Sequence, residues 1–279
     1  MNAHELEYCD FGNYEVIKNI LSKAFEIKDF TPVINAYDAF KKDFFKTPFE
    51  ELERKTIKRK YFKPITSNEG LIKNFFDEKF TIGFDVPVLI KNKKEGLKGC
   101  AFIVSEDPLR DGLKDAEVIL STPFGTHLPK HRDNKNKGKL YWDFAIWLLE
   151  QGYSSVYFTD IKKLWIKEVR KNKNETSKLL FPQDLLEHFR ACLEKELNDF
   201  EAQIIIAFGK DARESIQKIN PPVKVIDFIH PTFTASSHWR KDYKLPSASA
   251  ENKLNYMKGK FLRNANENPQ TTTQITHYS

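Results

Sequence analysis

The sequence predicts an α/β fold: a four-stranded, mainly parallel sheet flanked by helices. From Gly99 onward, short apolar runs alternate with segments of helical periodicity. The apolar runs, which are expected to be buried strands, are residues 100–106, 156–161, 203–209 and 224–230. The helical segments between them are residues 140–152, 182–200 and 210–219. Strands that alternate with helices need crossover connections, so the sheet is expected to be parallel and doubly wound.

Three segments of the chain differ in texture. Residues 1–95 are rich in Phe, Lys and Glu with helix-like spacing, as in NYEVIKNILSKAF, and predict a helical N-terminal extension. Residues 96–264 contain the alternating strands and helices and form the expected α/β domain. Residues 265–279 are polar and lack periodicity, which predicts a disordered tail.

The composition is that of a globular protein outside the membrane. Hydrophobic residues make up 40% of the 279 residues and charged residues 30%, and no apolar run reaches the roughly 18 residues of a membrane span. The N-terminal segment MNAHELEYCDFGNYEVIKN carries charges throughout and lacks the apolar stretch of a secretory signal. We therefore expect a cytoplasmic protein without membrane association, and a monomer.

Neither a metal nor a cofactor is predicted. The three cysteines lack paired spacing and are too few for zinc or an iron–sulfur cluster; they are Cys9, Cys100 and Cys192. His127 and His131 have the spacing of helical metal ligands, but Pro129 lies between them and no acidic ligand accompanies them. The chain has neither a G-x-x-x-x-G-K run nor a G-x-G-x-x-G run, so a nucleotide cofactor is not implied.

The net charge of +6, from 45 basic and 39 acidic residues, suits a polyanionic partner without requiring one. The carboxyl ends of the predicted strands are more informative, because ligands of open α/β sheets bind in the crevice beyond them. The first strand runs into SEDPLRDG and the second ends at Thr159 and Asp160. The third ends at Gly209 and the fourth at His230, which is followed by PTFTASSHWRK. Carboxylates and a histidine are therefore expected at one edge of the sheet.

Four of these segments, taken in order, resemble motifs of the uracil-DNA glycosylase superfamily. SEDPLR (105–110) is similar to the water-activating motif, and HPTFTAS (230–236) to the His-Pro-Ser motif with its minor-groove loop. IIIAFGKDA (204–212) is similar to the third-strand motif, and VYFTDI (156–161) takes the place of the strand with the base-reading residue. The resemblance covers roughly residues 99–263. It implies a glycosylase-like catalytic domain at 96–264 that flips a base out of double-stranded DNA and hydrolyses its N-glycosidic bond, leaving an abasic site.

The resemblance assigns roles to individual residues. Asp107 would orient the attacking water and stabilise positive charge on the sugar, as suits an oxocarbenium-like transition state. His230 would hydrogen-bond the base carbonyl while negative charge develops on the leaving base. Phe124, in STPFGTHLP, would stack on the flipped base and offset part of the cost of unstacking.

The remaining implied contacts fall into two sets. The base-binding set is Glu106, Pro108, Leu109, Phe124 and Asp160. The DNA-binding set is Lys130, His131, Arg132, Thr232, Phe233, Thr234, Ser236 and Arg240, with Phe233 as the apolar wedge. The basic loop 127–139, from which three of these come, either contacts phosphates or is simply solvated.

Two departures from the family pattern bear on the substrate. Leu109 stands where the best-known family has a tyrosine that excludes substituents on carbon 5 of the base, and so leaves more room. Asp160 stands where the base-reading asparagine is expected. An ionised carboxylate only accepts hydrogen bonds, so it suits the exocyclic amine of cytosine rather than a carbonyl of uracil. We therefore expect a cytosine-type base, such as the hydroxymethylated or glycosylated cytosines of some phage DNA, and a role in anti-phage defence would follow.

Several alternatives stay open at this point. The enzyme could excise uracil in DNA repair, could be a catalytically silent DNA-binding protein of the same fold, or could be an unrelated α/β enzyme acting on nucleosides. Asp-Pro at 107–108 could only start a turn, Phe124 could belong to the core, and Asp160 could cap a turn or pair with Lys162 or Lys163. A shift of one residue would put Thr159 in the site instead. A monofunctional enzyme is expected because the strand ends present no attacking lysine, although Lys162 and Lys163 keep that question open.

Overall fold

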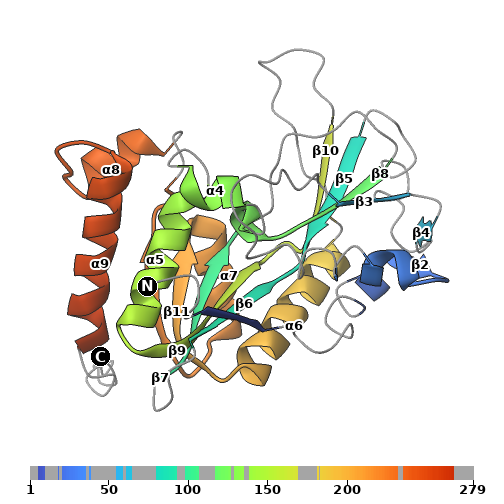
Figure 1. Ribbon diagram of the computed structural model, residues 1–279, viewed down its shortest axis with the longest axis horizontal. Helices are drawn as coiled ribbons and strands as arrows, with labels where there is room; N and C mark the ends of the chain where they lie inside the picture. The colour runs from blue at the N-terminus through green and yellow to red at the C-terminus, as the bar shows by residue number, and fades with distance from the viewer. Residues whose placement is uncertain are drawn as a thin grey trace, which may run out of the picture.

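The computed structural model describes residues 6–9, 18, 21–35, 38, 55–58, 61–64, 80–92, 98–106, 117–126, 129–134, 138–168, 181, 183–231 and 235–266. Its centre is a mostly parallel sheet covered by helices on both faces (Figure 1). The predicted α/β class is therefore confirmed.

Four parallel strands form the middle and one side of the main sheet, in the order β9-β7-β11-β12. They are β7 (Lys98–Ser105), β9 (Tyr153–Asp160), β11 (Ala202–Phe208) and β12 (Lys224–Phe228). Each coincides with one of the predicted apolar runs. Most side chains of β7, β9 and β11 are buried because helices cover both faces, whereas β12 at the edge of the sheet is only partly buried.

The sheet has six strands, so the predicted number of four was wrong. β6 (Val88–Asn92) pairs antiparallel with β9, and β1 (Leu6–Cys9) pairs antiparallel with β6. Both strands come from the segment predicted to be a separate extension. Both strands are short. β6 pairs with β9, which lies more than sixty residues away in the sequence, and β1 pairs with β6. This pairing decides the conformation of both strands.

Helices cover the two faces in pairs. α5 (Lys139–Glu150) and α9 (Ala250–Asn266) lie on one face, and α6 (Gln183–Asp199) and α7 (Lys210–Ile219) on the other. α7 has the predicted bounds, and α5 ends just before Gly152, whose φ of +93° is a left-handed conformation that glycine adopts without strain. Three short helices complete the described part: η3 (Pro123–Gly125), α4 (Pro129–Asp133) and α8 (Ser236–Asp242).

Further strands lie beside the main sheet. A four-stranded sheet has the order β10-β5-β8-β3 and a two-stranded sheet pairs β2 with β4. Their bounds are β10 (Leu164–Glu168), β5 (Phe80–Asp85), β8 (Glu117–Ser121), β3 (Lys55–Lys58), β2 (Phe25–Ile27) and β4 (Phe62–Pro64). The helical character predicted for residues 1–95 is thus wrong for most of the described residues there, although 18, 21–22, 31–35 and 38 are helical. Strand pairing over long sequence distances overrides the local helix-like spacing.

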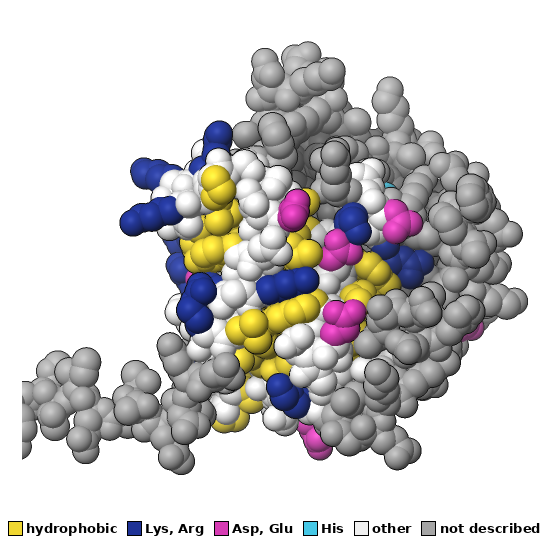
Figure 2. Space-filling model, turned by 60° about the vertical axis from the view of Figure 1, so that its left-hand side comes forward, with side chains coloured by type: hydrophobic (Ala, Val, Ile, Leu, Met, Phe, Trp, Pro, Cys, Tyr) yellow, Lys and Arg dark blue, Asp and Glu magenta, His cyan; other side chains and the backbone are white. Residues whose placement is uncertain are grey.

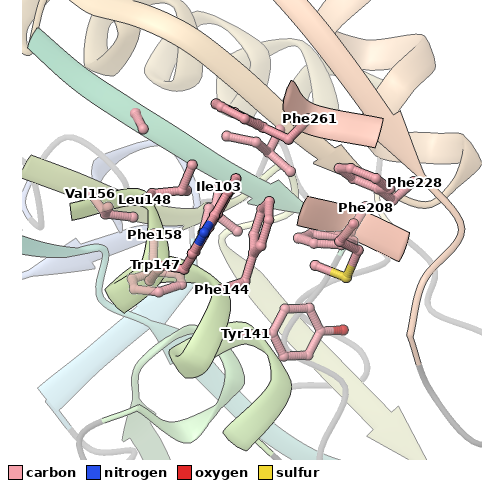
Figure 3. Packing of buried hydrophobic residues seen from close by; sticks show 14 of the residues in the cluster. Ile103, Tyr141, Phe144, Trp147, Leu148, Val156, Phe158, Phe208, Phe228 and Phe261 are labelled. Carbon is pink, nitrogen blue, oxygen red and sulfur yellow. The ribbon is translucent and has the colours of Figure 1, made fainter. Parts of the chain in front are cut away.

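Two apolar cores sandwich the main sheet. Between the sheet and the α5/α9 layer, aromatic rings predominate; those of Phe144, Trp147, Phe158, Phe208, Phe228 and Phe261 pack edge to face or stacked (Figure 3). On the α6/α7 face the core contains Phe102 stacked on Tyr157. Burying each such ring stabilises the fold by about 1.5–3 kcal/mol. Since side chains alternate along a strand, neighbouring residues at a strand end face different layers.

At the C-terminal end, α9 extends to Asn266, two residues into the predicted tail, and residues 267–279 lie outside the described part. Within the described residues, none of the helices has the length and apolar character needed to cross a membrane.

Candidate active site

The carboxyl ends of the four parallel strands gather polar side chains at one edge of the main sheet. Ser105 ends β7 and lies opposite Asp160, which ends β9. Gly209 follows β11, and His230 follows β12 by two residues. The structure thus brings together the strand ends that the sequence marks as a site.

Asp160 is the base-reading candidate at this edge. It is only 3% exposed, and its carboxylate accepts a hydrogen bond from the Ser105 hydroxyl. Its charge is felt by Tyr141, the third residue of α5: burial, and then the negative charge of Asp160, raise the pKa of that phenol well above its ordinary value. Thr159 faces the opposite layer, where its hydroxyl donates to Glu196 over 2.9 Å. Of the two neighbours, Asp160 is the one on the face that carries Tyr141.

The two lysines after β9 are engaged in ion pairs. Lys162 Nζ lies 2.9 Å from Glu106 Oε1 and 3.6 Å from Asp211 Oδ2. Lys163 is 1% exposed, and its Nζ lies 2.7 Å from Glu196 Oε2. An ammonium held by a carboxylate is a poor attacking amine, because the nucleophilic form is neutral. Neither lysine is therefore presented as an attacking amine in the described structure.

His230 is partly buried and held by its backbone. The indole N–H of Trp239 donates to its carbonyl over 3.2 Å, and Lys253 Nζ donates to the next carbonyl, that of Pro231, over 3.1 Å. Burial, together with the charge of Lys253, lowers the pKa of His230 to about 4. The imidazole is therefore neutral at pH 7, with one nitrogen as donor and the other as acceptor.

Tyr141 is the residue at this edge that sequence reasoning missed. Its hydroxyl oxygen lies 3.2 Å from Nδ1 and 3.2 Å from Nε2 of His230, so the phenol meets the imidazole edge between the two nitrogens. In the sequence, Tyr141 has the helical spacing of core residues such as Phe144 and Leu148, and it is 5% exposed. Only the polar tip, which needs a partner when buried, distinguished it from its apolar neighbours.

The ring of Phe124 lies beside this site, and its backbone has an unusual conformation. Its φ of 59° is left-handed, which is strained for an aromatic residue and typical of functional sites. Its ring stacks on Tyr141 with centroids 3.6 Å apart and planes 14° apart. The backbone of Gly138 fits closely against it: a Cβ there would stand 2.9 Å from the Phe124 carbonyl oxygen. One face of the predicted stacking platform is therefore already occupied.

A cavity of about 350 Å³ opens beside His230 and Glu106. Its lining includes the apolar Phe228 and Ile229 and several polar side chains. The polar lining residues are Glu106, Lys210, Arg213, Asp227, His238 and Asp242. Two contacts among them are Arg213 Nη1 to Asp227 Oδ2 at 3.7 Å and His238 Nδ1 to Asp242 Oδ2 at 3.3 Å.

Several predicted site residues lie outside the described part: Asp107, Pro108, Leu109, Thr232, Phe233, Thr234 and the side chain of Lys130. Among the others, Arg132 is only 8% exposed and its guanidinium lies 4.9 Å from the centre of the Trp142 ring. Burial lowers its pKa to about 10. Arg132 therefore packs within the protein in this structure, and its role as a DNA contact stays a prediction.

The predicted DNA contacts His131, Ser236 and Arg240 differ in accessibility. His131 and Ser236 are partly buried, whereas Arg240 is exposed on α8 together with Lys241. Lys and Arg side chains gather at the upper left of Figure 2, at the end of the molecule that carries α8. Because α8 begins soon after His230, this positive surface adjoins the site.

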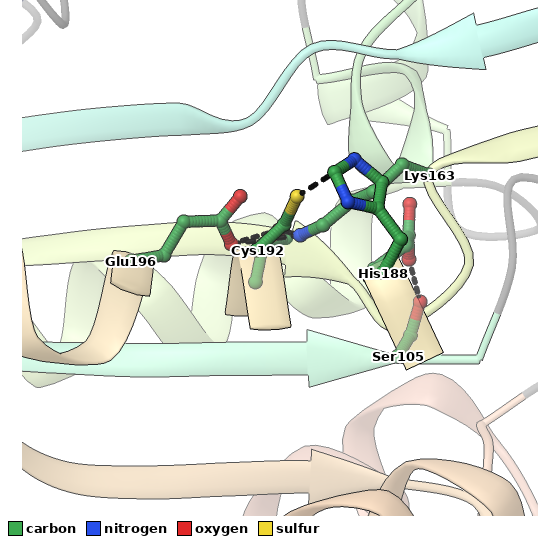
Figure 4. A network of polar contacts seen from close by, with 7 residues as sticks. Ser105, Lys163, His188, Cys192 and Glu196 are labelled. Atoms are coloured by element: carbon green, nitrogen blue, oxygen red, sulfur yellow. Dashed lines mark hydrogen bonds and ion pairs between the residues drawn. The ribbon is translucent and has the colours of Figure 1, made fainter. Parts of the chain in front are cut away.

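On the other face of the sheet, a second polar network is closed within the protein (Figure 4). Lys163 donates to Thr159 and Glu196, and burial raises the pKa of Glu196. Nearby, Cys192 Sγ lies 3.5 Å from His188 Nε2, and burial raises the pKa of this thiol to about 11. In the described part of the chain, His, Cys, Asp and Glu form no cluster of three that could hold a metal ion.

Comparison with known proteins leaves the function to be argued from this geometry. No family model matches the chain, and no curated protein matches it. The edge formed by Ser105, Asp160 and His230, with Tyr141 and Phe124 against it, is the part of the described structure where chemistry converges.

Proposed function

We propose that the protein is a monofunctional DNA glycosylase that flips a cytosine-type base out of DNA and hydrolyses its N-glycosidic bond. One observation carries the proposal: a buried carboxylate ends one parallel strand, a neutral imidazole follows another, and both lie beside a pair of stacked aromatic rings; these groups are Asp160 and His230. A base needs a π-face to stack on, a hydrogen-bond acceptor for its amine and a donor for its carbonyl. This edge offers one of each.

His230 supplies the donor. When the glycosidic bond breaks, negative charge accumulates on the leaving base, and a preorganised N–H at its carbonyl stabilises that charge. A neutral imidazole is sufficient for this role, and the lowered pKa of about 4 keeps it neutral. The Trp239 and Lys253 contacts hold the backbone of residues 230 and 231 in place without ordering by the substrate.

Asp107 supplies the second charge in this proposal, on the strength of the SEDPLR motif. The motif begins at Ser105, the residue that ends β7 and bonds Asp160. A carboxylate there would orient water and stabilise the developing oxocarbenium ion.

Asp160 selects the base. Its carboxylate accepts from the exocyclic amine of cytosine, whereas a uracil carbonyl would face it without a donor. Leaving a buried group without its partner costs about 1–3 kcal/mol, which corresponds to a preference of about 5-fold to 150-fold. The Ser105 hydroxyl fixes the carboxylate so that this preference is built in before the base arrives.

The cavity beside His230 supports a substituted base. Its volume of about 350 Å³ and the carboxylates and cations in its lining suit hydroxyl groups, as on a hydroxymethyl or glycosyl substituent at carbon 5. Unmodified cytosine must be spared, so contacts to the substituent would contribute to recognition. Removal of such bases would act against phages with modified genomes.

A panel of duplexes tests the proposal. Purified protein is incubated with duplexes that contain uracil, cytosine, 5-hydroxymethylcytosine or its glucosylated form, and abasic sites are cleaved with alkali. We expect cleavage of a modified-cytosine duplex and none with Asp107→Ala. Cleavage of uracil alone would reject the cytosine assignment. A shift in DNA mobility without alkali-labile sites would identify a silent binder, and activity on free nucleosides alone a different enzyme.

Asp160→Asn sharpens the assignment of the base. The amide adds a donor that can reach a uracil carbonyl, so we expect the variant to lose activity on the cytosine-type base and gain it on uracil. Unchanged base preference in a folded variant would remove Asp160 from base recognition. Thr159→Val, which alters the opposite face of β9, serves as the control and should leave the preference unchanged.

A further inference from the structure

We propose that Tyr141 occupies the slot that the flipped base enters, and that the base binds by displacing this ring. The inference rests on the proposed function and adds a gate to it. The proposed function assigns two contacts to the base, a stack on Phe124 and a hydrogen bond with His230. Tyr141 makes both of them.

The stack has the geometry of one flat ring laid on another. The centroids of Phe124 and Tyr141 are 3.6 Å apart and the planes differ by 14°, whereas most aromatic neighbours in this core meet edge to face. The backbone of Phe124 has a left-handed φ of 59°, and Gly138 packs closely against its carbonyl oxygen, so the position of Phe124 is set by the main chain. The platform is therefore built into the chain, and Tyr141 is what lies on it.

The polar end of Tyr141 also copies a pyrimidine. Its oxygen stands 3.2 Å from either nitrogen of His230, where the carbonyl of a base would have to be. Asp160 is near enough for its charge to act on the same hydroxyl. A six-membered ring with its oxygen at His230 and one face on Phe124 fills two of the positions that a bound base needs.

The alternative is that Tyr141 does not move. In that arrangement the base would stack on the face of Phe124 opposite to Tyr141. Such a base would be separated from Tyr141 by the whole Phe124 ring, while His230 stays at the Tyr141 hydroxyl. It would then lose the hydrogen bond to His230. Only a base in place of Tyr141 reaches both groups, which favours displacement.

The position of Tyr141 in its helix suits a movable ring. It lies in the first turn of α5, whose N-cap, Gly138, makes no side-chain capping bond. First turns lack part of the intrahelical hydrogen bonding and open more readily than helix centres. A base that enters restores the stack and the hydrogen bond that Tyr141 gives up. A base still paired in the duplex gains neither, so the gate favours bases that are already extruded.

A cavity experiment tests the slot without DNA. Tyr141→Ala should leave a flat, polar-ended cavity on Phe124, and we expect millimolar free cytosine to raise its melting temperature by several degrees. Wild type and Tyr141→Phe, in which a ring still fills the slot, should not respond. Tyr153→Ala is the matched control, since Tyr153 is 6% exposed, against 5% for Tyr141, and starts β9 at the opposite edge. Equal stabilisation of wild type, or stabilisation of Tyr141→Ala by phenol but not by cytosine, overturns the gate.

A second measurement follows the Tyr141 ring in the otherwise native protein. It decides whether Tyr141 is displaced if Tyr141→Ala fails to fold or binds neither cytosine nor phenol. With 3-fluorotyrosine at position 141, the ¹⁹F resonance carries the ring-current shift of Phe124. We expect saturation with the duplex that is cleaved best, using Asp107→Ala protein to prevent cleavage, to move the resonance to its unstacked position. An unmoved resonance at saturation overturns the gate.

The two proposals fail in different ways. If Tyr141→Ala binds cytosine but the wild-type protein makes no abasic sites, the base slot is supported and the glycosylase activity is rejected. Abasic-site formation with an unmoved fluorotyrosine resonance would leave the glycosylase and remove the gate.

Discussion

Two polar clusters flank the end of β9, one on each face of the main sheet. On the α6 face, Lys163 and Glu196 form a buried ion pair, and the Thr159 hydroxyl is hydrogen-bonded to both. On the α5 face, Asp160 bonds Ser105 and lies near Tyr141, which contacts His230 and Phe124. Adjacent residues of one strand thus enter two different environments.

The two clusters suit different roles: the α6 cluster suits a structural role, and the α5 cluster suits the binding of a ligand. The α6 cluster is neutral overall and pairs its charges internally, so it joins the main sheet to α6 and leaves little for a ligand. The α5 cluster combines a carboxylate, an imidazole kept neutral and a strained aromatic residue, and a cavity of about 350 Å³ adjoins it. Burial of polar groups alone does not mark a site. A site is marked by groups that can exchange their present partner for a substrate.

The largest expected effect belongs to the α6 cluster. Glu196→Leu leaves the Lys163 ammonium buried at 1% exposure without its counter-charge, so we expect the free energy of unfolding to fall by about 3–5 kcal/mol. Urea unfolding measures it. Adding Lys163→Met should recover most of the loss, because the charge is then gone as well. A loss below about 1 kcal/mol would show that water or another group compensates Lys163.

The next effect belongs to the α5 cluster and concerns rate. His230→Ala removes the donor to the leaving base, so we expect a 10²- to 10³-fold fall in single-turnover abasic-site formation. His188→Ala, on α6 at the other face, should leave the rate unchanged. Equal rates for wild type and His230→Ala would exclude His230 from the chemistry.

The same histidine should make stability depend on pH. Its pKa is about 4 in the folded protein and near 6.5 when unfolded, so between these values the unfolded chain binds more protons. Its contribution to stability is therefore complete above pH 6.5 and is lost as the pH falls toward 4, by up to about 3 kcal/mol. Urea unfolding from pH 7.5 to 4.5 should show a smaller decline in His230→Asn. Parallel declines in both proteins would mean that His230 titrates normally.

The smallest effect concerns the surface beside the α5 cluster, where Arg240 and Lys241 are exposed on α8. Arg240→Ala should remove one phosphate interaction, which reduces the salt dependence of DNA binding by about one unit of slope. Lys195→Ala is the control, because it removes the same charge from α6, where Lys195 pairs with Asp199 at 2.6 Å. The slope is measured by titration at several salt concentrations. Equal slopes for wild type and both variants would place the DNA elsewhere.

The fold was predictable where local pattern and tertiary context agree. The four parallel strands and helices α5, α6 and α7 follow from apolar runs and helical spacing. β1 and β6 did not, because short strands with mixed polarity gain their structure from pairing with β9 and with each other. The same holds for β3 and β5, which the helix-like spacing of the first ninety-five residues concealed, and for β8, a short strand paired between them.

The sequence by itself determined which residues end the parallel strands, and so that Asp160 and His230 share one edge, because parallel strands point the same way. Only the tertiary structure decided that Tyr141 contacts His230 and lies near Asp160, that Arg132 is buried over the Trp142 ring, and that Thr159 faces Glu196. These contacts join segments far apart in the chain. Their geometry depends on how helices pack on the sheet, which no local pattern of residues encodes.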